Sequence, residues 1–182
     1  MKKLMIAAGL ITALGLAAFA TTGGLPVSFA GTWTLDKAKS QGLSQRMQNA
    51  DSVTCVITQN DNTISVEWKV EGGQPPAAGA GAGAGGGRGP AGPQTYNLDG
   101  KEVTSEAGGQ MGGTNTMKAS WSDATKTLEL SSVRTGSFNG NEFKATTTDK
   151  MSLSEDGKVL TVVRHSESPR GAQDSTLVFN KQ

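Results

Sequence analysis

Three charged residues in the C-terminal half of the chain have the chemistry and the spacing to recognise a polar ligand. A hairpin folded about residues 156–157 sets Asp149 opposite Arg164 on the face that also carries the leucines and methionines of these strands. Arg134, on the preceding strand, has the same inward phase. Because an isolated buried charge is unfavourable, we expect Asp149 and Arg164 to pair.

A guanidinium binds a carboxylate through two parallel hydrogen bonds, so Arg164, together with Arg134, is a candidate for holding an anionic head group. This role depends on register, since a three-residue loop with a bulge at Gly157 would turn Arg164 outward. Arg134 lies near a strand end, where we expect it to be solvated. The predicted ligand-binding residues, including inward aromatic and methionine side chains, are Arg164, Asp149, Arg134, Trp68, Trp121 and Met117.

The remaining residues with chemical potential are weaker candidates. His165 is the single histidine and has the opposite phase from Arg164, so it is expected on the solvent face of its strand. Cys55 is the single cysteine, has no base placed beside it by the sequence, and is expected to be a small buried apolar residue. We find no phosphate loop, nucleophile elbow, dinucleotide fingerprint or metal-ligand spacing, and therefore expect no catalytic residue, metal or cofactor.

The elements that must position these residues are β-strands. Apolar and polar residues alternate without a break over residues 64–70, the pattern of a strand with one buried face. Turn-forming residues recur at 59–62, 98–101, 122–125, 138–141 and 155–158, and five hairpins imply about ten strands. Only residues 36–49 are expected to be helical, with Asp36 as the N-cap.

Folding each hairpin about its turn brings apolar residues opposite one another, as a buried face requires. The predicted pairs are Ile57–Ile64, Cys55–Val66, Val53–Trp68, Ala119–Leu128, Met117–Leu130, Leu128–Met151, Leu153–Leu160 and Met151–Val162. The same alignment places polar residues together at one end of the interior, with Ser132 beside Thr147 and Arg134 beside Ala145.

So many consecutive antiparallel strands favour closure into an up-and-down barrel, although a Greek-key β-sandwich would use the same strands. The opening strand, with Gly31-Thr32-Trp33, resembles the Gly-x-Trp start of lipocalins, the calycin-type small barrels. That resemblance implies a barrel in which Trp33 packs at the closed end and an arginine covers it. Arg164, neutralised by Asp149, would then stack on Trp33 and have a structural role.

The N-terminus carries an export pattern. Lys2 and Lys3 precede an apolar run that ends in Ala18-Phe19-Ala20, so residues 1–20 are expected to be a signal peptide, with an uncleaved membrane anchor as the alternative. Without the two lysines, 17 basic residues become 15 against 16 acidic ones, a net charge of −1 that gives no sign of nucleic-acid binding.

The remaining residues, 21–182, suffice for one β-barrel domain. Residues 72–93 interrupt it with ten glycines and four prolines, a composition expected to form a disordered loop between two strands. Deleting residues 74–92 should therefore leave stability almost unchanged.

Three classes of function fit this sequence. The first is an exported, periplasmic or extracellular protein that binds a small, partly apolar, anionic ligand, with no membrane span after signal removal. The second is a non-catalytic structural or interaction module of the cell envelope with a filled barrel, and an enzyme is third. Cavity volume separates the first two classes, since large inward side chains such as Trp68 and Met117 either fill the barrel or line a site.

Overall fold

A computed structural model describes residues 27–72, 92–106, 113–122, 126–138 and 140–182. The predicted signal peptide lies outside the described residues, as does the Gly/Ala-rich loop apart from its ends. In the described part, short strands follow one another along the chain, as the alternating pattern predicts. They are β1 (Gly31–Leu35), β2 (Ser52–Gln59), β3 (Thr63–Glu71), β4 (Gln94–Asn97), β5 (Val103–Glu106), β6 (Thr114–Ser122), β7 (Thr127–Phe138), β8 (Asn141–Leu153), β9 (Val159–Ser168) and β10 (Gly171–Lys181), with one short helix, α1 (Gln45–Asn49).

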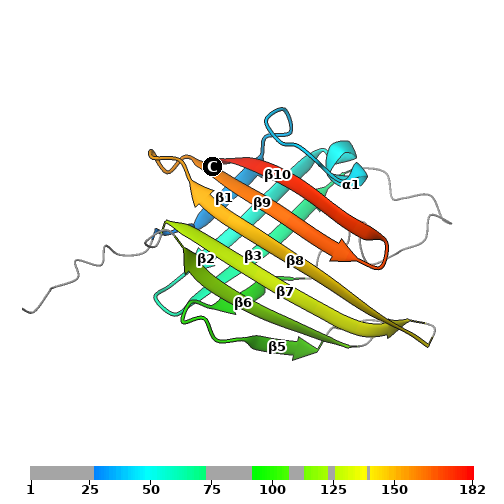
Figure 1. The fold of residues 1–182 in the computed structure, drawn as a ribbon. Helices are drawn as coiled ribbons and strands as arrows, with labels where there is room; N and C mark the ends of the chain where they lie inside the picture. The colour runs from blue at the N-terminus through cyan, green and yellow to red at the C-terminus, as the bar shows by residue number, and fades with distance from the viewer. Residues whose placement is uncertain (1–26, 73–91, 107–112, 123–125, 139) are drawn as a thin grey trace, which may run out of the picture.

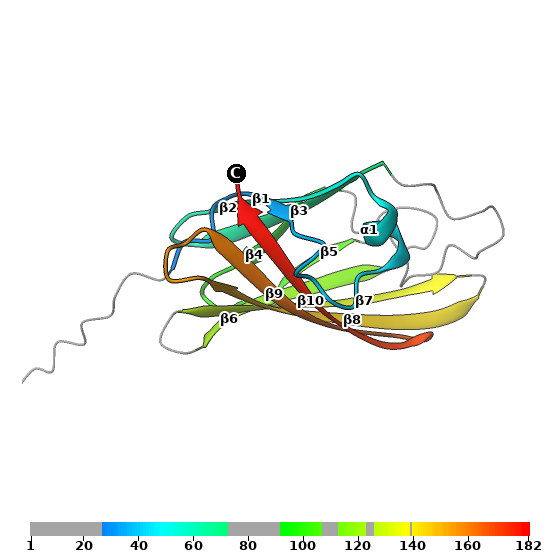
Figure 2. The ribbon, with the colours of Figure 1, turned by 90° about the horizontal axis from the view of Figure 1, so that it is seen from above.

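The ten strands form a single antiparallel sheet in the order β4-β3-β2-β1-β10-β9-β8-β7-β6-β5. β1 pairs with β2 on one side and with β10 on the other, so the first described strand meets the last one and the sheet curls into a nearly closed barrel (Figures 1 and 2). The predicted up-and-down barrel is therefore confirmed, and the sandwich alternative is wrong. In both views α1 and the β7–β8 turn lie toward the same end of the barrel, which we call the α1 end.

One predicted hairpin does not form. The turn at residues 98–101 connects β4 to β5, but these strands pair with β3 and β6 instead of with each other. The sheet therefore has its two free edges at this turn. The hairpin between β9 and β10 turns at Pro169 and Arg170, a signal that the sequence analysis did not use.

Two predicted registers are wrong by two residues. Cys55 faces Trp68 and Ile57 faces Val66, because the Asn60 side chain accepts hydrogen bonds from the backbone N–H groups of residues 62 and 63 and moves the turn along the chain. In the β6–β7 hairpin the observed pairs are Ala119–Leu130 and Trp121–Leu128. A shift of two keeps every side chain on its predicted face.

The registers of the last hairpins are confirmed. Leu128 faces Met151, and Leu153 faces Leu160. The register across the β8–β9 turn agrees with the predicted one. Ser154 N–H donates to the carbonyl of Val159 at 2.9 Å, and Gly157 takes the positive φ of 66° that a tight turn needs. Asp149 therefore stands opposite Arg164, as predicted.

The predicted helix over residues 36–49 is wrong in its first two thirds. Asp36 begins a turn, accepting the N–H of Lys39 on its side chain, and α1 starts only after Ser44, whose Oγ accepts the N–H of Met47. Residue 41 instead forms an antiparallel bridge to Thr176 of β10. Backbone pairing with β10 thus outweighs the local helical preference of this segment.

The core occupies the barrel interior. Phe29 and Trp33 are fully buried, and Phe29 stacks on Trp121 with ring centroids 6.1 Å apart; this end of the barrel is called the Phe29 end. The other buried apolar residues of the strands are Leu35, Val53, Cys55, Ile57, Ile64, Val66, Tyr96, Met117, Ala119, Leu128, Leu130, Met151, Leu160, Val162, Leu177 and Phe179.

Candidate functional site

The predicted Asp149–Arg164 ion pair is present. Arg164 Nε donates to Asp149 Oδ1 at 2.6 Å and Arg164 Nη2 donates to Oδ2 at 2.7 Å, a bidentate arrangement. The side chains are 22% and 14% exposed, respectively. Burial lowers the pKa of Arg164, but the attraction of Asp149 and its hydrogen bonds outweigh that effect, so the pKa is raised and the group stays charged.

Arg164 covers a different tryptophan from the one that the lipocalin resemblance implies. Its guanidinium carbon lies 4.6 Å from the ring centroid of Trp68, which itself packs edge-on against Phe179 at 5.5 Å. The cation over Trp33 is Lys181, at 5.2 Å, and Trp33 Nε1 donates to the carbonyl of Phe29. The expected stacking of Arg164 on Trp33 is therefore wrong. A cation does cover Trp33, but it is Lys181, and Arg164 covers Trp68.

Cys55 and Tyr96 are buried, and Cys55 stands opposite Trp68, the ring that Arg164 covers. Burial raises the pKa of the Cys55 thiol to about 12, so the sulfur is a neutral thiol at physiological pH. Burial likewise raises the pKa of Tyr96, whose hydroxyl donates to Gln94 Oε1 at 3.3 Å. The expectation that Cys55 is a buried apolar residue is confirmed.

Arg134 differs from the expectation that it is solvated. Its side chain is half-buried, opposite Ala145 of β8, and its Nε is buried without a hydrogen-bond partner among the described residues. The guanidinium carbon lies 6.0 Å from the ring centroid of Phe143. The inward phase of β7 places this side chain on the inner face of the barrel and not on its outer surface.

The inner wall of β7, β8 and β9 changes character along its length. Toward the Phe29 end its side chains are apolar and, apart from the half-buried Leu153, buried, whereas toward the α1 end they are half-buried and mostly polar. The half-buried inward residues are Ser132, Arg134, Phe143, Ala145, Thr147 and Ser166. Among them, the hydroxyls of Thr147 and Ser166 lie 3.5 Å apart across the β8–β9 pair.

The structure does not bring all the predicted ligand-binding residues together. Trp68 meets the Asp149–Arg164 pair through its ring. Met117 is buried opposite Ser132 and belongs to the core, and Trp121 lies four residues further along β6, against Phe29. Phe143 lies beside Arg134 and was not among the residues predicted from the sequence. The one feature of the sequence that could have pointed to it is its inward phase on β8.

His165 lies on the outer face of β9, as expected. Its ring nitrogens hydrogen-bond Asp174 Oδ1 at 2.6 Å and Glu167 Oε1 at 3.3 Å, and these two contacts raise its pKa. Within the described ranges, no three His, Cys, Asp or Glu side chains gather in a way that could hold a metal ion.

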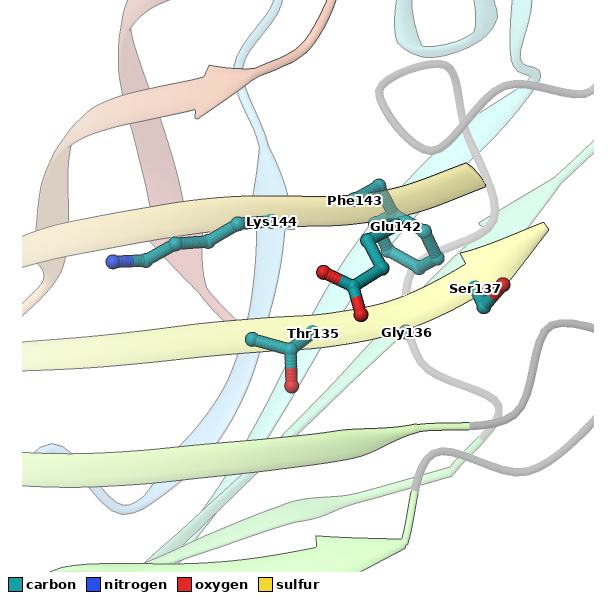
Figure 3. Close-up of a pocket in the computed structure, with 6 residues that line it drawn as sticks. All are labelled: Thr135, Gly136, Ser137, Glu142, Phe143 and Lys144. Carbon is teal, nitrogen blue, oxygen red and sulfur yellow. The ribbon is translucent and has the colours of Figure 1, made fainter. Parts of the chain in front are cut away.

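Two hollows lie near the β7–β8 turn. One of about 510 Å³ is lined by Thr135, Gly136, Ser137, Glu142, Phe143 and Lys144 (Figure 3), and another of about 430 Å³ continues from Glu142 to Ser168 and Pro169. Thr135, Glu142 and Lys144 lie on the outer face of their strands, and Phe143 is an inward residue that borders both hollows. Neither hollow reaches the Asp149–Arg164 pair.

No protein-family model and no curated protein sequence matches this chain. A solved structure of zebrafish ileal bile acid-binding protein complexed with cholic acid is similar at 13% identity and a TM-score of 0.45, over 85% of this chain and 98% of that one. At this level of likeness the ligand of that protein carries no implication for this chain. The structure has the nearly closed antiparallel barrel that the opening strand with Gly31 and Trp33 led us to expect, but it has ten strands where lipocalins have eight, so it does not single out lipocalins.

None of the helices in the described part of the chain has the length and apolar character needed to cross a membrane.

Proposed function

We propose that this chain is an exported binding protein that holds a small, partly apolar, anionic molecule inside the α1 end of its barrel. Export is supported by the charged, apolar and small-residue pattern of residues 1–20. Binding is supported by the inner wall, and one observation carries it. Inward side chains at the α1 end keep partial exposure, whereas five inward side chains further along the same strands are at most 3% exposed: Leu128, Leu130, Met151, Leu160 and Val162.

Partial exposure of inward side chains indicates that solvent enters this end of the barrel. In the part of a barrel that its own side chains fill, inward residues away from the rim are buried, because protein interiors pack at the density of organic crystals. Arg134, Thr147 and Ser166 are inward and half-buried, so this region is both accessible and polar. A ligand entering here would replace water instead of displacing packed core.

Apolar surface for the rest of the ligand is available beside the polar wall. Trp68 and Val70 of β3, Met47 of α1 and Leu43 are partly buried apolar side chains that pack against the core. Small-molecule sites combine such apolar lining with a few polar groups that fix orientation. The arrangement therefore suits an amphipathic molecule with its head group toward β7 and β8.

A fluorescence titration with N-phenyl-1-naphthylamine, an uncharged apolar fluorophore, tests this proposal. Ala145→Phe fills the inward position opposite Arg134 and should weaken binding by at least about tenfold, because the added ring takes the ligand's space. Lys144→Phe adds the same ring one residue away on the outer face and should leave the Kd within about twofold.

Absence of saturable binding to the parent chain, or equal weakening by both variants, would contradict the proposal. Thermal unfolding of both variants is measured beside the titration, so that loss of binding through misfolding is recognised.

The second candidate function is a structural or interaction module of the cell envelope. It is favoured by the apolar core of the Phe29 end, where Phe29 and Trp33 are fully buried, and by an ion pair whose two charges are satisfied by each other without a ligand. A barrel filled throughout predicts that Ala145→Phe overpacks the interior and destabilises it by about 1 to 3 kcal/mol. An α1 end that is open accommodates the ring with little change in the free energy of unfolding.

A further inference from the structure

We infer that Arg134, and not Arg164, binds the ligand's head group, and that the head group is a single carboxylate. This inference rests on the proposed function and deepens it, because it assigns the residue that selects the ligand and the chemical class selected.

Arg164 is already engaged on the edge that recognises carboxylates. Its Nε and Nη2 both donate to Asp149, and its face lies over Trp68. A ligand carboxylate would have to displace an internal one that holds the same bidentate geometry without any loss of freedom on binding. Arg164 with Asp149 is therefore part of the wall of the site.

Arg134 has the same carboxylate-binding edge of its guanidinium, and the Nε–H donor on that edge has no partner in the described part of the chain. Its Nε is buried and makes no hydrogen bond to any described residue, which is unfavourable for a charged donor. The residue opposite it is Ala145, whose small side chain has no polar group that could pair with the guanidinium, and the Phe143 ring centroid lies 6.0 Å from the guanidinium carbon. A carboxylate oxygen at Nε removes the unsatisfied donor, so binding gains more here than at an arginine exposed to water.

The charge of this region selects a monoanion. In the inward phase of β7, β8 and β9 the charged residues are Arg134, Asp149 and Arg164. Asp149 and Arg164 neutralise each other, so the region carries one net positive charge at Arg134. A carboxylate balances that charge, whereas a phosphate dianion leaves one excess negative charge in a half-buried place.

The test compares two probes that differ only in charge, 11-(dansylamino)undecanoic acid and its primary carboxamide, by fluorescence titration at pH 7.5. The parent chain should bind the acid at least about tenfold more tightly than the amide, as a charge-assisted hydrogen bond implies. Arg134→Gln should abolish this preference while the Kd of the amide stays within about twofold. Arg134→Lys should restore part of the preference, since it keeps the charge and loses the planar fork.

Lys144→Gln is the matched control, because it removes one positive charge from the outer face of the neighbouring strand and should keep the preference. A preference that survives Arg134→Gln, or equal binding of acid and amide by the parent chain, overturns the inference and leaves the proposed function standing. Failure of both probes to bind the parent chain counts against the proposed function itself. A competition experiment tests the head-group class, with dodecanoate and dodecyl phosphate each displacing the bound fluorescent acid. Stronger displacement by dodecyl phosphate than by dodecanoate would overturn the carboxylate assignment.

Discussion

The half-buried Asp149–Arg164 pair makes a quantitative prediction about stability. The variants are Asp149→Asn, Arg164→Met and the combination of the two, each close in size to the parent residue. Each single change leaves one charge without its partner in the barrel wall, and the double change removes both charges. The free energy of unfolding is measured by urea denaturation, followed through the fluorescence of the three tryptophans.

The expected magnitudes follow from burial and geometry. The two side chains are only 22% and 14% exposed, and both guanidinium-to-carboxylate hydrogen bonds are short. Breaking such a pair destabilises by about 3 to 5 kcal/mol, and each single variant should fall near the lower value because some water reaches the groups. The double variant should be less destabilised than the sum of the singles by about 2 kcal/mol or more.

An exposed pair on the other face of the same strand supplies the control. Lys150 Nζ lies 3.8 Å from Glu129 Oε2, and the two side chains are 60% and 38% exposed. The cycle built from Lys150→Met and Glu129→Gln should show a coupling of only about 0 to 0.5 kcal/mol, because water screens it. Coupling as weak at Asp149–Arg164 as at this surface pair would refute the view that the former pair lies inside the barrel.

Three further outcomes are expected. Trp68→Ala should lower the free energy of unfolding by about 3 kcal/mol, because the packing against Phe179 and Arg164 is lost. Glu67→Ala, on the outer face, should change it by less than about 0.5 kcal/mol. Similar losses in the two variants would mean that the inward and outward faces of β3 have been assigned wrongly. Cys55 should resist Ellman's reagent at pH 8 in the folded chain and react at once in urea, since burial raises its pKa to about 12; a fast reaction of the folded chain would place the thiol in solvent. His165 should titrate above its ordinary pKa in an NMR pH series, and the Asp174→Asn variant should bring its pKa back toward the ordinary value. Because the pKa is raised in the folded state, the small stability from this contact is complete below about pH 6.5 and is lost as pH rises through the folded-state pKa. The same His165 pKa in the parent and the variant would show that the contact with Asp174 does not form.

The features that the sequence predicted well are set by local geometry. The opposition of Asp149 and Arg164 follows from a short turn at Gly157 and from the period of two, and nothing distant in the chain disturbs either. The two registers that shifted did so by an even number of residues, so the division into inner and outer faces survived. That division depends on the alternation of apolar and polar residues, and a register shift of two residues at a turn leaves each side chain on the same face.

The features that could not be predicted depend on contacts between distant strands. Arg164 lies over Trp68 because β9 faces β3 across the barrel, and the distance between them is set by how ten strands close. The free edges at β4 and β5 are equally nonlocal, since the turn between these strands resembles the hairpin turns elsewhere. The segment after β1 carried a helical pattern, but its bridge to Thr176 is made by strand β10 at the far end of the sequence.

Arginine side-chain NMR tests the central claim most directly. The chain is labelled with ¹⁵N-arginine, and the Nε–H signals of Arg134 and Arg164 are followed as dodecanoate is added. Binding at the α1 end predicts that the Arg134 Nε–H signal moves downfield and exchanges more slowly with water, while the Arg164 signal, already hydrogen-bonded to Asp149, stays nearly fixed. A saturating titration in which the Arg134 signal does not move, or in which only Arg164 responds, would contradict this assignment of the site.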